Sequence, residues 1–195
     1  AVPEWLRDTQ YTSDSPWEVR KKTRDLIRAN VDFIKITICG SVAGGETGFA
    51  VRNHTPEEIS AIVEEAHSFG YKVAAHAYSA PLIKEAINSG CDSIEHGFPL
   101  DDEAAELLAR KQIPLIPTLQ VYMEKPKGWE NVVPEYAVRK TKHLGKFCKS
   151  SFRKAVKAGV KIALGTDIQI NYPPARQHGD NAFELELMVK CGMSI

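Results

Sequence analysis

Apolar and polar residues follow the period of a strand in some segments of this chain and the period of a helix in others, and the two kinds of segment alternate. Short β-prone runs occur near residues 31–38, 72–77, 92–95, 113–119 and 160–166, and they predict five strands. Apolar residues at helical spacing predict helices near 15–29, 56–69, 80–89, 101–111, 135–158 and 181–191. Strands that alternate with helices in this way are typical of βα units around a parallel sheet.

Local signals at the ends of these segments support the same pattern. Ser15–Glu18 and Thr55–Glu58 both have a capping-box sequence with Pro at the first helical position, which predicts two helix starts. A glycine follows three of the helices directly before a strand, where a left-handed residue ends a helix well: Gly70, Gly90 and Gly159. The stretch Gln120–Pro134, rich in Pro and Gly, predicts a long loop after the fourth strand.

Composition limits the kind of protein that the pattern builds. The 195 residues are enough for one domain with a core, and we expect a single domain over 1–195. Lys plus Arg equals Asp plus Glu at 25 each, which argues against nucleic acid as a partner and against an anionic membrane. No apolar run approaches the ~20 residues of a membrane-spanning helix. Four widely spaced cysteines without a CxxC pair predict free thiols, and we expect a cytoplasmic protein.

Four residues of metal-binding type lie at or near predicted strand ends: Lys35, His76, His96 and Asp167. A parallel barrel brings the C-terminal ends of its strands to one mouth, where catalysis takes place in that fold. His nitrogen and carboxylate oxygen are zinc ligands. A lysine can join them only after carboxylation by CO2 has made its tip a carbamate. Taken singly, Lys35 also fits an edge strand or a side chain reaching solvent, and each histidine also fits a structural role.

The sequences around these residues resemble the amidohydrolase superfamily. The matching segments are Phe33-Ile-Lys-Ile36, Val73-Ala-Ala-His-Ala-Tyr78, Ser93-Ile-Glu-His-Gly97 and Ala163-Leu-Gly-Thr-Asp167. Within the superfamily they are most similar to the group of imidazolonepropionase-like enzymes and Xaa-Pro or Xaa-Arg dipeptidases. The segment from His178 to Met188 resembles the part of these enzymes that follows barrel strand eight.

The resemblance implies a site with two divalent ions, of which zinc suits the ligands best. Lys35 on barrel strand four would be the carboxylated lysine that bridges them. His76 on strand five and His96 on strand six would bind one ion. Asp167 on strand eight would bind the other and act as the catalytic base on a metal-bridging hydroxide. Tyr78 and His178 are candidates for substrate binding, although a packed barrel tyrosine and a surface histidine are equally good readings.

One expected motif of the superfamily is missing. Its first strand carries a His-x-His pair, and none of the six histidines here forms such a pair. A (β/α)8 barrel runs to ~250 residues. We therefore expect an α/β fold that is a partial TIM barrel of about five βα units, corresponding to strands 4–8 and lacking strands 1–3. The open sheet edges of such a fragment would favour a homo-oligomer or a complementing segment.

These observations lead to a metal-dependent hydrolase of C–N bonds in amides or peptides. The expected substrate is a small molecule or a dipeptide, and the expected activity is that of a dipeptidase or a carboxypeptidase-like enzyme. A cyclic-amide hydrolase of the imidazolonepropionase type is the enzymatic alternative, although a bridging Lys35 implies two metals and argues against it. The remaining alternative is a non-catalytic, truncated half-barrel that binds no metal.

Overall fold

The computed structural model describes residues 12–124, 128–168 and 179–194. Its centre is a parallel four-stranded sheet in the order β1-β2-β3-β4. The strands are β1 (Ile34–Thr37), β2 (Val73–Ala77), β3 (Ser93–His96) and β4 (Leu115–Ile116). Because neighbours in the sheet are also neighbours in the sequence, each connection crosses over a single helix in the manner of consecutive βα units.

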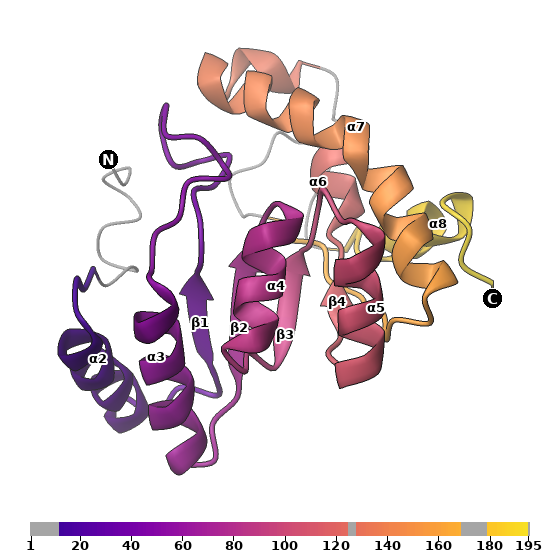
Figure 1. Cartoon of the computed structure of the whole chain (residues 1–195). Helices are drawn as coiled ribbons and strands as arrows, with labels where there is room; N and C mark the ends of the chain where they lie inside the picture. Colours follow the sequence, from indigo (N-terminus) through magenta and orange to yellow (C-terminus); the bar gives the residue numbers. More distant parts are fainter. Residues whose placement is uncertain (1–11, 125–127, 169–178, 195) are drawn as a thin grey trace.

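Helices cover one face of the sheet and one of its ends (Figure 1). Helices α3, α4 and α5 lie side by side in front of the strands in this view, α2 packs against α3, and α7 crosses above α5 and α6. The bounds are α2 (Pro16–Arg28), α3 (Pro56–Ser68), α4 (Ala80–Asn88), α5 (Asp102–Lys111), α6 (Leu119–Met123), η1 (Trp129–Asn131), α7 (Glu135–Lys157) and α8 (Ala182–Lys190). Among the described residues, no helix combines the length and the apolar character needed to cross a membrane.

The predicted helix starts are confirmed in atomic detail. At α3, the Thr55 hydroxyl accepts the Glu58 N–H at 3.3 Å while the Glu58 carboxylate accepts the Thr55 N–H at 2.8 Å, which is a complete capping box. At α2, Ser15 caps the Glu18 N–H, but the Glu18 carboxylate reaches the N–H of Asp14 instead. Both helices therefore begin where the sequence predicts.

The core lies between the sheet and the covering helices. Apolar side chains at every second strand position are buried there, among them Ile34, Ile36, Val73, Ala75 and Ile94. Burying one isoleucine of this kind stabilises the fold by about 1.5–3 kcal/mol. The alternate positions face the other side of the sheet, which is where the polar strand residues lie.

Two predictions about strands are wrong in part. The fourth strand, expected over 113–119, is only Leu115–Ile116. Pro114 and Pro117 flank it, and because proline has no N–H it cannot continue a ladder. The fifth strand, expected over 160–166, is reduced to one parallel bridge between Leu115 and Ile162. Because the neighbouring strand β4 has only two residues, the segment 160–166 has few backbone groups to pair with.

The long loop expected over Gln120–Pro134 is also wrong in part. Helix α6 begins at Leu119 and ends at Met123, and the short 3-10 helix η1 covers Trp129–Asn131. The Trp129 side chain is buried. Apolar side chains within the stretch thus pack into the core, whereas the Pro and Gly content alone had favoured a loop.

Candidate functional site

The C-terminal edge of the sheet brings the predicted ligands together from several elements. Thr37, His76 and Glu95 are partners across β1, β2 and β3, so His76 and Glu95 face the same side of the sheet. Lys35 lies two residues before Thr37 and on that same side, in the middle of β1 and not at its end. Asp167 follows the segment that pairs with β4.

His96 reaches this side of the sheet through its backbone conformation. Strict alternation would place His96, which follows Glu95, on the opposite face from His76. Its φ of 67° is left-handed, and this turns the side chain toward His76. Residues other than glycine adopt such a φ seldom and at a cost of about 1–3 kcal/mol, often at functional sites.

The two imidazoles form a hydrogen-bonded pair. His96 Nε2 lies 2.9 Å from His76 Nδ1. The ring centroids are 4.6 Å apart, and the interplanar angle of 77° makes the two rings nearly perpendicular. His96 Nδ1 lies 2.7 Å from the Thr118 hydroxyl, and His76 Nε2 lies 3.4 Å from the carbonyl oxygen of Gly40. Since a carbonyl only accepts, Nε2 of His76 carries the proton and its Nδ1 presents a lone pair to the site.

Burial keeps both histidines neutral. Burial and, to a smaller extent, the positive charge of Lys35 together lower the pKa of His76 to about 4. Burial also holds the pKa of His96 well below its usual value, with smaller effects from His76 and Lys35. A neutral imidazole has a free nitrogen lone pair, which is the form that binds a metal ion.

Lys35 pairs with the carboxylate of Glu95 and also experiences the charge of Asp167. Its Nζ is 3.9 Å from Glu95 Oε2, and 45% of its side chain is exposed. Burial around the amine lowers the pKa of Lys35, while the charges of Glu95 and Asp167 oppose that shift. A lowered pKa increases the fraction of neutral amine, the nucleophilic form that reacts with CO2.

Asp167 has a left-handed backbone with a φ of 51°, and its side chain is exposed. Its charge acts on groups from three other elements. It opposes the lowering of the Lys35 pKa. It also adds to the effect of burial in raising the pKa values of Tyr78 and Tyr122. The carboxylate therefore belongs to the same electrostatic environment as Lys35 and the tyrosines.

Tyr78 packs beneath the histidine pair. It is fully buried, its ring stacks on His96 with centroids 5.1 Å apart, and its hydroxyl pairs with that of Tyr122. This geometry supports the imidazole of His96 directly, and the substrate-binding role of Tyr78 stays a prediction. His178 lies outside the described residues.

Sequence reasoning missed three residues of this site: Glu95, Thr118 and Tyr122. Glu95 carried a usable signal, because it directly precedes His96 in a predicted strand. In the sheet it is the partner of His76. Thr118 and Tyr122 carried none, since Thr118 lay in the strand predicted over 113–119 and Tyr122 lay in the predicted loop. Among the described residues, no three His, Cys, Asp or Glu side chains gather closely enough to hold a metal ion.

The donor atoms nevertheless suit a metal ion in part. A tetrahedral zinc ion with Zn–N bonds of ~2.0–2.1 Å separates two nitrogens by roughly 3.3 Å. The facing nitrogens of His76 and His96 are 2.9 Å apart, so a small ring rotation would let one ion replace their hydrogen bond. Two neutral imidazoles supply two ligands, and further ligands are needed from carboxylates or a carbamate.

Three known proteins are similar to this chain over most of its length. A Xaa-Pro dipeptidase structure with methionine in its active site superposes with a TM-score of 0.79 at 35% identity, covering 93% of this chain and 44% of that one. A prolidase in complex with N-methylphosphonate-L-proline gives a TM-score of 0.74 at 31% identity, covering 80% and 38%. Ochratoxinase from Aspergillus niger is 32% identical over 183 residues, which are 92% of this chain and 36% of ochratoxinase.

The chain therefore spans well under half the length of these relatives. Its parallel βα units form part of a (β/α)8 barrel, as the resemblance had implied. The model of the amidohydrolase family matches residues 5–195, nearly the entire sequence. This chain belongs to the amidohydrolase family.

Proposed function

We propose that the protein carrying this chain is a metal-dependent hydrolase of C–N bonds in amides or peptides. One observation carries the proposal: nitrogens of two neutral imidazoles lie 2.9 Å apart on the side of the sheet where Lys35 also lies, and Lys35 in turn experiences the charge of Asp167. The similarity to a Xaa-Pro dipeptidase and to a prolidase supports a dipeptide-like substrate, from which a terminal amino acid would be released.

The residues that would hold the metal follow from their atoms. Nδ1 of His76 and Nε2 of His96 would bind one divalent ion, and zinc suits imidazole and oxygen ligands together. Lys35, once carboxylated, would contribute anionic oxygens to both ions, and Asp167 would contribute a carboxylate oxygen to the other ion. When bound, zinc would polarise the scissile carbonyl and lower the pKa of the attacking water.

Asp167 would move the proton. Its carboxylate would accept a proton from the water as the water oxygen attacks the amide carbon, and it would return this proton to the leaving amine nitrogen as the C–N bond breaks. The carboxylate is exposed at the strand ends, where a substrate can reach it. Proton transfer by a side chain of this kind contributes typically about 10²- to 10⁴-fold to the rate.

Asp167→Asn should therefore lower kcat by about 10²- to 10⁴-fold on a dipeptide panel. Asp32→Asn makes the same charge change at the opposite end of β1 and serves as the control, with kcat expected to remain at the level of the unmodified protein. Both variants should unfold at the same temperature as that protein. Full activity in Asp167→Asn would rule out the assigned role.

Metal content distinguishes the hydrolase from a chain that binds none. The described residues contain no complete three-donor cluster, which favours the non-catalytic alternative. Elemental mass spectrometry on intact protein, purified with bicarbonate and without chelators, should give about two metal ions per chain if the two-metal proposal is right. A value near zero that persists after zinc addition would support the alternative. Cleavage of lactams in preference to dipeptides would point to a cyclic-amide hydrolase.

A further inference from the structure

Glu184 of α8 is a fully buried carboxylate that holds the start of α6. Its Oε1 accepts the Leu119 N–H at 2.6 Å, and its Oε2 accepts the Gln120 N–H at 2.9 Å. Hydrogen bonds to an ionised acceptor are roughly twice as strong as neutral ones. A buried carboxylate spanning 65 residues of sequence in this way fixes the position of the segment that it binds.

This arrangement changes what Thr118 can do. A threonine directly before a helix normally caps the first N–H groups with its own hydroxyl. Thr118 makes no such bond and has a left-handed backbone with a φ of 47°, which is uncommon for a β-branched residue. Because Glu184 satisfies the two N–H groups, the Thr118 hydroxyl is available to His96 Nδ1 at 2.7 Å.

The hydroxyl suits either tautomer of His96. In the hydrogen-bonded pair, Nε2–H of His96 donates to His76, and Nδ1 accepts from the Thr118 hydroxyl. A cation at Nε2 needs the other tautomer, in which Nδ1–H donates to the same oxygen. Thr118 can serve both states only while its oxygen stays at the ring, and that position depends on the start of α6.

A second branch leads from α6 to Asp167. The side-chain amide of Gln120 donates to the carbonyl oxygen of Thr166 at 3.3 Å. Thr166 directly precedes Asp167, whose left-handed backbone aims its carboxylate. Glu184 thus supports two of the four predicted metal ligands indirectly, because it binds the backbone of Leu119, next to Thr118, and that of Gln120.

We propose that Glu184 is a positioning residue of the metal site, setting the orientation of His96 through Thr118 and that of Asp167 through Gln120. The inference deepens the proposed function and depends on it for the identity of the ligand. Residues that support metal ligands from behind typically change metal affinity by about 10- to 100-fold when they are replaced.

The first test is a double-mutant cycle on zinc affinity, measured on the intact polypeptide by competition with a chromogenic chelator. Glu184→Gln should weaken zinc binding about 10- to 100-fold, because a carboxamide sets an NH2 group against one of the two N–H donors. Thr118→Val should weaken zinc binding similarly. Thr118→Ser keeps the hydroxyl and should bind zinc as tightly as the unmodified protein. The double variant should bind zinc little more weakly than Glu184→Gln alone, since Thr118→Val removes a contact that Glu184→Gln already disturbs.

Glu186→Gln is the matched control, because it makes the same chemical change at an exposed position of α8. Its zinc affinity should equal that of the unmodified protein. Glu184→Gln with unchanged zinc affinity, or strictly additive losses in the cycle, would overturn the inference while leaving the hydrolase proposal intact.

The second test needs no metal and keeps the two proposals separable. In the metal-free protein labelled with 15N-histidine, Glu184→Gln should shift the imidazole resonances of His96 and leave those of His143 in place, whereas Glu186→Gln should shift neither. Circular dichroism confirms that each variant is folded. Unshifted His96 resonances in folded Glu184→Gln would reject the inference. A shift in a protein that binds no zinc would retain the positioning of His96 and reject the metal proposal.

Discussion

At the scale of single residues, strained backbone gathers where the site lies. Positive φ values at residues other than glycine occur at Asn30 and Gln112, which end helices, and also at Ser79, His96, Thr118 and Asp167. Of the last four, His96 is the final residue of β3, and the others follow a strand or a strand-like segment at one edge of the sheet. Each costs about 1–3 kcal/mol, so surrounding contacts have to hold it in place. The hydrogen bonds of His96 and Thr118 are such contacts.

A different single residue, Glu65, makes part of the stability dependent on pH. Its carboxylate accepts hydrogen bonds from Arg24 at 2.6 and 3.1 Å, and only 6% of its side chain is exposed. These bonds lower the pKa of Glu65 below 4.5, against the opposing effect of burial. Because the folded pKa lies below the unfolded one, the stabilisation is present above pH 4.5 and is lost as the pH falls through the folded pKa.

Glu65→Gln should therefore lower the urea midpoint of unfolding at neutral pH, and the difference from the unmodified protein should shrink in acid below pH 4.5. Glu64→Gln, in which an exposed neighbour on the same helix loses its ion pair with Arg20, should have a smaller effect. A difference for Glu65→Gln that stays constant through acid would contradict this explanation.

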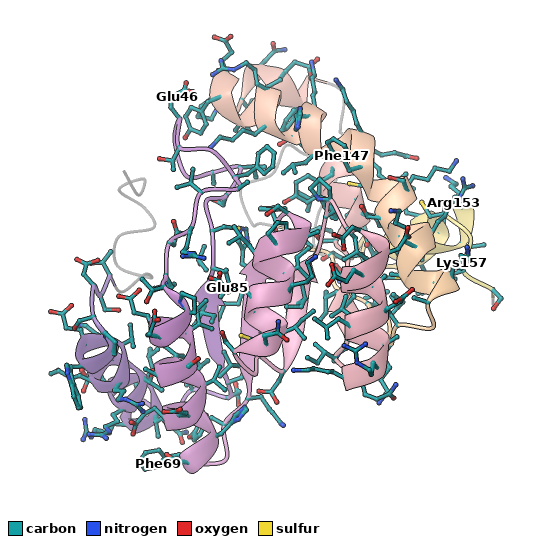
Figure 2. The ribbon with its side chains drawn as sticks, in the orientation of Figure 1. Glu46, Phe69, Glu85, Phe147, Arg153 and Lys157 are labelled. Carbon is teal, nitrogen blue, oxygen red and sulfur yellow. The ribbon has the colours of Figure 1, made fainter. Side chains whose placement is uncertain are left out.

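At the scale of elements, α7 connects the site to the loop that follows β1. Lys140 donates to the carbonyl oxygens of Ser41 and Gly45, and Arg139 forms an ion pair with Glu46 at 2.9 Å. Figure 2 shows Glu46 at the tip of this loop beside the first turns of α7. The loop begins at Gly40, whose carbonyl oxygen lies next to His76. The N-terminal half of α7 thereby holds the segment that orients this imidazole.

The middle of α7 approaches α6 closely at Gly145. A Cβ at this position would lie 2.6 Å from the carbonyl oxygen of Tyr122, a backbone atom that cannot rotate away. Gly145→Ala should gain about 1 kcal/mol of helix propensity and lose about 1–3 kcal/mol to overpacking. We expect a net destabilisation of up to about 2 kcal/mol in urea unfolding.

The control for this change is Ser150→Ala on the exposed face of α7, where greater helix propensity should leave stability equal or slightly higher. If Gly145→Ala stabilised the protein as much as the control, the close contact between α6 and α7 would be wrong.

At the scale of the whole molecule, the sheet is strongest at its centre. Strands β2 and β3 have a neighbour on each side, whereas the segment 160–166 makes a single bridge to β4. Leu164 in that segment is 47% exposed. Central strands with buried hydrogen bonds open only in large unfolding events, while segments with few contacts open locally.

Hydrogen exchange followed by mass spectrometry should therefore show the slowest exchange in peptides that contain β2 and β3. Peptides from 160–166 should exchange at least about tenfold faster, which corresponds to ~1.4 kcal/mol in opening free energy. Equal protection would mean that residues 160–166 form a full strand, as the sequence had predicted.

Local sequence alone determined the order of β1 to β4 and of the helices between them, the capped starts of α2 and α3 and the parallel βα arrangement. It also determined the choice of Lys35, His76, His96 and Asp167 as candidates. Periodicity and caps depend on residues within a few positions of one another, so they are visible in one dimension. The family resemblance, confirmed by the match over residues 5–195, came from short motifs of the same local kind.

Only the tertiary structure decided how these side chains meet. It turned His96 toward His76 against strict alternation, and it placed Glu184 against the start of α6 from 65 residues away. Such contacts depend on backbone rotation and on packing between distant segments, and neither leaves a periodic trace in the sequence. The physical reason is that such a hydrogen bond forms between groups that the packing of distant elements brings together. The residues next to them in the sequence do not determine it.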